Sequence, residues 1–207
     1  MAYADNVFIN CPFDAEFEPL RYAIVFAILD CGFTPRCALE AANGGNVRFD
    51  SIKKLIEDSR FGLHDISRTE LDLDNGLPRF NMPLELGVFI GASRYGNRLQ
   101  KSKSILILDK EQYRYQKFIS DIAGQDIRAH KNLESNVITC VRNWFTTESN
   151  RKDLPGGEHI FSRYMQFKAE LPAVCKKTKI ELKELTYSDY VAFAAEWVSA
   201  EPLATPD

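Results

Sequence analysis

The stretch SILILD at residues 104–109 has the pattern of a strand that is buried on both faces. Its central residues, ILIL, are all aliphatic, and the run is too short for a helix of ordinary length. Two lysines, Lys101 and Lys103, flank its start, which we expect to meet solvent. Strands buried on both faces are typical of parallel sheets covered by helices, so this stretch predicts an α/β fold.

Similar segments recur on both sides of this strand. Short apolar runs bounded by turn-forming residues predict four more strands, at 7–10, 33–39, 61–67 and, as a short edge strand, 126–130. Apolar residues at helical spacing predict the helices between them, at 17–31, 49–56, from Met82 onward, 111–124 and 133–145. Because strands and helices alternate, we predict a doubly wound, flavodoxin-like parallel sheet of five strands in residues 5–148, with the order 2-1-3-4-5.

A helical extension is expected to follow this domain. Residues 146–157 are polar and rich in turn-forming residues, and apolar residues at helical spacing return in 157–198. Three roles stay open for this C-terminal extension: to cover the edge of the sheet, to assemble a homo-oligomer or to contact another protein. The tail at 199–207 is expected to be disordered.

The composition is that of an ordinary globular protein. The chain has 207 residues, of which 45% are hydrophobic and 27% charged, and its net charge of -3 gives no basic surface for nucleic acid. The five cysteines show no C-x-x-C spacing, which favours reduced thiols in the cytoplasm. We expect no targeting segment and no membrane span, because no apolar run approaches about 18 residues.

The predicted strand order places a ligand crevice between strands one and three, at their carboxyl ends. Its walls are NCPFD at 10–14 and DISRTE at 65–70, and the helix that begins near Met82 lies close by. Polar residues follow apolar strands in both walls, so we predict substrate binding here. A simpler interpretation of Asn10 and Asp14 is that they only shape the turn and cap the next helix.

One carboxylate, Glu85, interrupts the apolar start of that helix in PLELGVFIGA at 83–92. A charge buried among such neighbours is costly without a partner. A capping role is one explanation, because a glutamate in the first turn can accept backbone N–H bonds. Catalysis is the other, because a carboxylate can bind ribose hydroxyls and stabilise the oxocarbenium-like charge of glycosidic cleavage. One carboxylate suffices when the leaving group is already cationic, as nicotinamide is in NAD.

Three stretches, NVFINCPFD at 6–14, GLHDIS at 62–67 and NMPLELGVFIGA at 81–92, resemble the bacterial Toll/interleukin-1 receptor-like (TIR-like) domains, which are similar to nucleoside 2-deoxyribosyltransferases. The likeness covers about residues 5–148 and rests on strand order, loop position and the P-x-E-x-G core. It implies a flavodoxin-like domain that cleaves the nicotinamide–ribose bond of NAD, as an NAD glycohydrolase or an ADP-ribosyl cyclase or transferase. In bacteria it implies a role in antiphage defence signalling.

By this resemblance Glu85 is the catalytic glutamate, and Phe13 is placed to stack on a base. The implied substrate-binding residues lie in the two loops and at the start of the helix: Asn10, Cys11, Pro12, Phe13, Asp14, Asp65, Ser67, Arg68, Asn81 and Met82. NAD or a related nucleotide is then the substrate, and no cofactor is expected. The expected partners are further copies of the chain and a phage-derived trigger or a downstream effector that senses the product.

Two alternatives stay open for the function. Glu85 can act as a covalent nucleophile on nucleosides, as the deoxyribosyltransferases use theirs. The domain can also be a non-catalytic TIR-like interaction module whose glutamate is only a cap. Cys11, which stands beside Pro12, has no histidine near it in the sequence and is interpreted as a small buried residue rather than a nucleophile.

Two further patterns give no site. The histidines, His64, His130 and His159, share no ligand spacing, so we predict no metal and expect structural or surface roles. The stretch GGNVR at 44–48 is rich in glycine but has no lysine–serine pair after it. We interpret it as a flexible loop over the crevice rather than a phosphate-binding loop.

Overall fold

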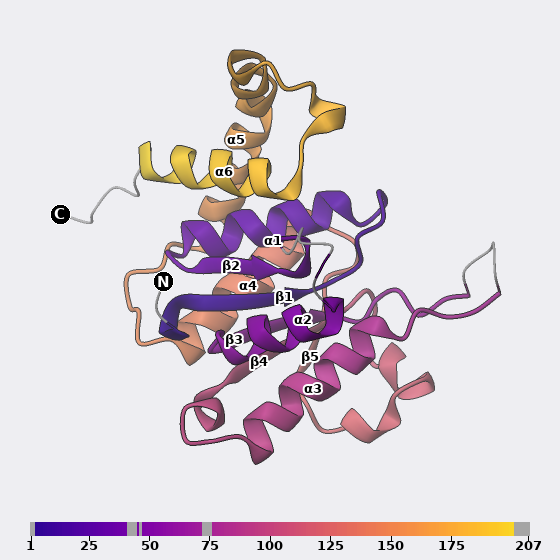
Figure 1. Cartoon of the computed structure of the whole chain (residues 1–207). Helices are drawn as coiled ribbons and strands as arrows, with labels where there is room; N and C mark the ends of the chain where they lie inside the picture. The colour runs from indigo at the N-terminus through magenta and orange to yellow at the C-terminus, as the bar shows by residue number, and fades with distance from the viewer. Residues whose placement is uncertain (1–2, 41–44, 46, 72–75, 201–207) are drawn as a thin grey trace.

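A computed structural model describes residues 3–40, 45, 47–71 and 76–200 of the chain (Figure 1). It contains a parallel sheet of five strands in the order β2-β1-β3-β4-β5, which confirms the predicted flavodoxin-like topology. The strands are β1 (Asn6–Asn10), β2 (Thr34–Cys37), β3 (Phe61–Asp65), β4 (Ser104–Asp109) and β5 (Ile127–Ala129).

The register of the central strands brings their carboxyl ends to one edge of the sheet. Asn10 at the end of β1 lies beside His64, one residue before the end of β3. Asp65, which ends β3, lies beside Leu108 of β4. The polar residues that follow the apolar strands therefore gather along one edge, as expected for parallel strands.

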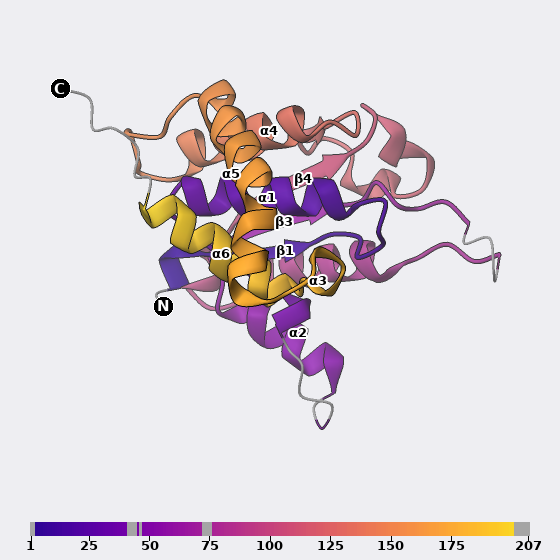
Figure 2. The same cartoon turned by 90° about the horizontal axis from the view of Figure 1, so that it is seen from above.

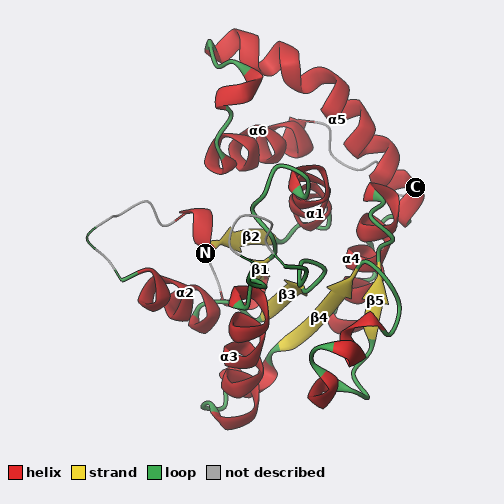
Figure 3. Cartoon of the chain, turned by 90° about the vertical axis from the view of Figure 1, so that its right-hand side faces the viewer, coloured by secondary structure: helices red, strands yellow, loops and turns green. Residues whose placement is uncertain are grey.

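Helices cover both faces of this sheet (Figure 3). One face carries α1 (Glu18–Asp30) and α4 (Glu134–Glu148), and the other carries α2 (Arg48–Glu57) and α3 (Asn81–Tyr95). Alternate residues of each strand pack against the helices on the two faces, because successive side chains of a strand point in opposite directions. Phe8 thus stacks on Phe89 of α3 with ring centroids 6.4 Å apart, while its neighbours in β1 pack on the α1 side.

The C-terminal helices form a further layer over α1. Figures 1 and 2 show α5 (Gly157–Thr178) and α6 (Tyr187–Ala200) against the side of α1 that faces away from the sheet. Phe26 of α1 has its ring centroid 5.5 Å from that of Phe167 and 5.8 Å from that of Trp197. Because α1 is packed on two sides, it is apolar nearly all round, and the predicted extension shares the core of the sheet domain.

The prediction of a helix at 111–124 is wrong. This segment forms two short 3-10 turns, η4 (Arg114–Lys117) and η5 (Ser120–Ile122). Tyr113 takes a left-handed conformation with φ 62°, which interrupts the helical path, and the side chain of Arg114 bonds inward to the neighbouring loops. Tyr115 and Ile122 then cover the second face of β4 in place of a helix.

Some expectations fall on residues outside the described ranges. These include residues 44 and 46 of the predicted loop over the crevice, residues 41–43 before it, part of the loop after β3 (72–75) and most of the tail (201–207). Among the helices that the structure describes, none is both long and apolar enough to cross a lipid bilayer.

Candidate active site

Asn10 links the end of β1 to the start of α3. Its side-chain nitrogen donates one hydrogen bond of 2.8 Å to the carbonyl oxygen of Met82 and lies 3.0 Å from Nδ1 of His64. Burial, with a smaller contribution from Lys103, lowers the pKa of His64 to about 3, so its ring is neutral and Nδ1 accepts the second hydrogen of the Asn10 amide. This buried bridge fixes α3 relative to the crevice.

Asp65, at the end of β3, is fully buried and holds two neighbouring segments. Its Oδ1 accepts hydrogen bonds from the backbone N–H of Ser67 at 2.9 Å and from the hydroxyl of Ser67 at 2.5 Å. Its Oδ2 lies 3.1 Å from Nε2 of His130, a contact that lacks hydrogen-bond alignment within the described residues. Since Nδ1 of His130 accepts the N–H of Asn132 at 3.0 Å, Nε2 carries the ring proton and faces the carboxylate. His130 is fully buried and its Nδ1 is used by a backbone N–H, so we assign it a structural role.

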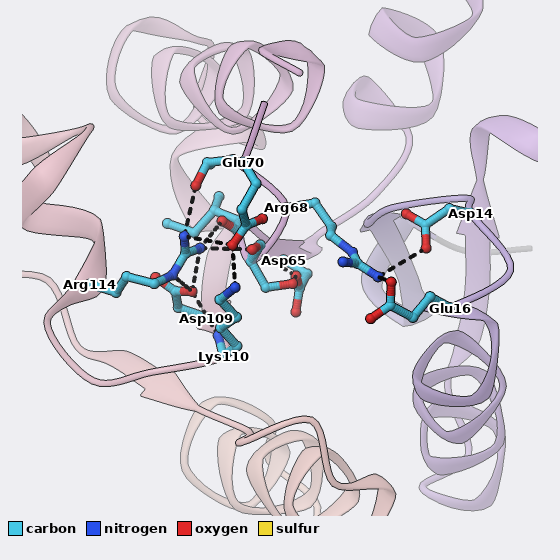
Figure 4. A network of polar contacts seen from close by, with 11 residues as sticks. Asp14, Glu16, Asp65, Arg68, Glu70, Asp109, Lys110 and Arg114 are labelled. Atoms are coloured by element: carbon cyan, nitrogen blue, oxygen red, sulfur yellow. Dashed lines mark hydrogen bonds and ion pairs between the residues drawn. The ribbon is translucent and has the colours of Figure 1, made fainter. Parts of the chain in front are cut away.

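Arg114 joins the loops after β3 and β4 (Figure 4). It bonds to Oδ1 of the buried Asp109 through Nε at 2.8 Å and to the hydroxyl of Thr69 at 2.8 Å. It also donates to the carbonyl oxygens of Ile66 and Ser67, each at 2.9 Å. Sequence reasoning missed this residue. The signal was present in Asp109, which ends the SILILD strand and, being buried, needs a cation or several donors.

The predicted crevice between the β1 and β3 loops is present as a hollow of about 230 Å³. It is lined by Asp14, Glu16, Arg68, Glu70, Leu71 and Arg79. Figure 4 shows Arg68 reaching across from the β3 loop, with its guanidinium 3.3 Å from Asp14 and 2.6 Å from Glu16. Asp14 also accepts the N–H of Phe17 at 2.9 Å, one residue before α1, so the turn-forming interpretation holds for Asp14 alongside its place in the crevice.

Glu85 is not a helix cap. Because α3 begins at Asn81, Glu85 is its fifth residue and lies beyond the first turn, and the first turn contains no acidic residue. Its side chain is half-buried, and burial raises its pKa from 4.5 to about 7, an effect that Arg48 partly offsets. Within the described part of the chain it makes no hydrogen bond or ion pair. A half-buried carboxylate without a hydrogen bond lowers the stability of the fold, so its presence is not explained by a structural contact.

The surroundings of Glu85 lie at the ends of β1 and β2. Burial raises the pKa of the thiol of Cys11 well above its usual value and that of Cys37 to about 12, and the negative charge of Glu85 contributes to both shifts. The bond from Asn10 to Met82 places the start of α3, and with it Glu85, at the carboxyl edge of the sheet. Glu85 does not line the 230 Å³ hollow.

The other predicted binding residues differ in their access to solvent. Cys11 is only 2% exposed, and its raised pKa keeps it a thiol rather than a nucleophilic thiolate. Pro12 and Met82 are buried, Phe13 is half-buried between the cores of the two sheet faces, and Asn81 is exposed. Of this group, only Phe13 and Asn81 have side chains that can reach a ligand without rearrangement.

The described residues contain no group of three or more histidine, cysteine, aspartate or glutamate side chains placed to hold a metal ion. Neither a protein-family model nor a curated protein matches the chain. The features that bear on function are the fold, the residues at the carboxyl edge and the state of Glu85.

Proposed function

We propose that the protein cleaves the N-glycosidic bond of NAD or a closely related nucleotide, with Glu85 as the catalytic residue. The fold and the position of Glu85 at the carboxyl edge support this proposal. The observation that carries it is the state of the carboxylate, which is half-buried, unpaired among the described residues and raised in pKa to about 7 by burial. Strongly shifted groups in such positions are characteristic of catalytic sites.

The chemistry needs one carboxylate. When the bond between C1 of the ribose and the nicotinamide nitrogen breaks, its electron pair stays with the nitrogen and the cationic ring becomes neutral. Positive charge then develops on the ribose, where an ionised Glu85 stabilises it. Water adds to C1 and gives up a proton, which a carboxylate with a pKa near 7 accepts at neutral pH.

The wider setting is part of the same proposal. We place the protein in the cytoplasm, where its five free cysteines stay reduced. The resemblance to TIR-like domains adds antiphage defence signalling, a homo-oligomeric active form and a phage-derived trigger or downstream effector. Assembly can then be a condition for activity, so the enzyme is best assayed over a wide range of protein concentration.

The first experiment identifies the substrate class. Purified protein is incubated with NAD and, separately, with 2-deoxynucleosides, and free nicotinamide or free base is followed by NMR. Release of nicotinamide supports the proposal, and release of base from deoxynucleosides alone would favour the deoxyribosyltransferase alternative. Bound NAD without turnover at any protein concentration would favour the non-catalytic module.

A further inference from the structure

A second hollow, which we call the α4 hollow, lies on the α1 side of the carboxyl edge. Its volume is about 420 Å³, within the range of small-molecule sites. It is lined by Glu16, Phe17, Pro19, Leu20, Ser67, Arg68, Lys110, Asn132, Leu133, Glu134 and Lys168. These residues come from the start of α1, the loops after β3 and β4, the start of α4 and the middle of α5. Glu85 is not among them.

Three cations converge on the α4 hollow from different elements. Arg68, Lys110 and Lys168 have side chains that are 29%, 26% and 46% exposed, so each can reach a ligand. The first turn of α4 adds the positive end of a helix dipole on the same side. The side chains supply most of the positive charge at the hollow, and the helix end adds to it.

Each cation is paired with a carboxylate that a ligand can replace. Arg68 pairs with Glu16 at 2.6 Å, and the side chain of Glu16 is 80% exposed. Lys168 pairs with Glu134 at 2.7 Å, and Lys110 pairs with Glu70 outside the hollow. Glu16 is the most exposed of these carboxylates, and a pair with such an exposed partner is worth little, so an anion with several oxygens can replace Glu16 on Arg68 at low cost. Glu134 is held more firmly, because it also accepts a 2.8 Å hydrogen bond from the hydroxyl of Tyr164.

Besides the charged residues and the polar Ser67 and Asn132, the lining of the hollow is apolar. Pro19 and Leu133 are both exposed at the hollow, and Leu133 has 52% of its surface accessible. Phe17 and Leu20 lie deeper, at 2% and 5% exposure. Apolar walls beside convergent cations suit a ligand that has a flat or apolar part and an anionic group.

We propose that the α4 hollow binds a phosphate-bearing compound of mononucleotide size, with its phosphate on Arg68, Lys110 and Lys168. This site is separate from Glu85 and does not depend on the proposed catalysis. Arg68 and Glu16 also line the crevice, so a phosphate in the α4 hollow competes with Asp14 and Glu16 for the same guanidinium.

Binding is measured by isothermal titration calorimetry on the full chain at physiological ionic strength. The probes are AMP, inorganic phosphate and adenosine, which separate the phosphate from the nucleoside. We expect AMP to bind more tightly than adenosine by at least tenfold. Phosphate alone binding as tightly as AMP would support the same cation site with free phosphate as its source, whereas equal binding of adenosine and AMP, or no binding of AMP, would overturn the proposal.

Charge variants place the site in the protein. Lys168→Ala is expected to weaken AMP binding about tenfold, the size of one charge-assisted contact. Glu16→Gln is expected to tighten it severalfold, because it removes the carboxylate that competes for Arg68. Lys176→Ala, on the exposed surface of the same helix and outside the hollow, is the matched control. Equal affinities for wild type, Lys168→Ala and Glu16→Gln would place the ligand elsewhere and overturn the proposal.

The Glu85→Gln variant separates this inference from the proposed function. It is expected to bind AMP with the affinity of the wild type, because Glu85 does not line the α4 hollow. Loss of AMP binding in Glu85→Gln would show that AMP occupies the catalytic site instead and would overturn the second site while leaving the proposed function standing.

Discussion

The side-chain amide of Asn10 donates a 2.8 Å hydrogen bond to the carbonyl oxygen of Met82, and this bond joins the end of β1 to the first turn of α3. The same amide faces Nδ1 of the neutral His64, so its orientation is fixed by two acceptors. Glu85 follows three residues after Met82 on the same helix. Asn10 is therefore a positioning residue for the carboxylate, although it does not touch it.

Replacing Asn10 tests this positioning role. Asn10→Ala leaves two buried acceptors without their donor and should lower the free energy of unfolding by about 1–3 kcal/mol, measured by urea denaturation. Asn6→Ala is the matched control, because Asn6 is equally buried at the other end of β1 and donates a 2.8 Å bond to the carbonyl oxygen of Asp58. Both variants should lose stability, but only Asn10→Ala should also lose turnover. Equal turnover in the two variants would reject the positioning role.

Replacing Glu85 should stabilise the fold, in contrast to the loss expected of a cap. Its pKa is raised by burial from 4.5 to about 7, so the ionised form is disfavoured in the folded state. The wild type therefore loses stability relative to Glu85→Gln as the pH rises from about 4.5 to about 7, and the difference is constant above that range. Because Glu85 is partly exposed to solvent, the free energy of unfolding of Glu85→Gln should exceed that of the wild type by only about 1–2 kcal/mol at high pH. A Glu85→Gln variant that is less stable than wild type at neutral pH would show that the carboxylate has a structural partner.

Gly62 in β3 should tolerate no side chain. A Cβ there would lie 2.6 Å from Cζ of Phe89 and 2.8 Å from Nε2 of His64, both in the buried layer between the sheet and α3. Gly62→Ala should therefore cost about 1–3 kcal/mol of unfolding free energy, measured by thermal or urea denaturation. Gly91→Ala on α3 is the opposite control, because outside the backbone of its own helix a Cβ there meets no atom of a non-neighbouring residue within 4 Å. Gly91→Ala should raise the free energy of unfolding by about 0.5–1 kcal/mol, because alanine has the higher helix propensity. A result in which Gly91→Ala destabilises the protein and Gly62→Ala does not would contradict the described packing of β3 on α3.

Arg163 should anchor the C-terminal helices to the sheet domain. Its guanidinium bonds to both carboxylate oxygens of the buried Asp30, with distances of 2.9–3.2 Å. Arg163→Ala should cost about 3–5 kcal/mol near neutral pH, because it leaves a buried charge without its partner. Burial raises the pKa of Asp30 and Arg163 opposes that shift, so the cost should shrink as the pH falls and Asp30 takes up a proton. The double variant Arg163→Ala with Asp30→Asn should recover part of the loss, and no recovery would contradict the ion pair as the cause.

The sequence was sufficient to predict the sheet. The run ILIL predicted a strand buried on both faces, and in β4 Leu106, Ile107 and Leu108 are buried while Ile105 is partly buried. The helix expected at 111–124 failed because Arg114 bonds to loops that lie more than 40 residues away in the chain, and local spacing carries no trace of such bonds.

The candidate site was predictable only in outline. Polar residues after apolar strands placed Asn10 and Asp65 at the carboxyl edge, where both were predicted to bind substrate. The structure shows both side chains buried and bonded within the protein, and neither lines the 230 Å³ hollow. Their partners were not predictable, because Met82 is 72 positions from Asn10 and is met only through the fold. The capping alternative for Glu85 depended on where α3 begins, and helix ends are the least certain part of a pattern.

The central claim is tested most directly by nicotinamide release from NAD by wild type and Glu85→Gln, at the highest attainable protein concentration. Glu57→Gln, which changes an exposed glutamate of α2, is the matched control. The wild type and Glu57→Gln should turn NAD over, with a rate that falls about tenfold per pH unit below about 7 as Glu85 is protonated. Glu85→Gln should remain folded and lose at least about 100-fold in rate. Turnover by Glu85→Gln at the rate of the wild type would contradict the account.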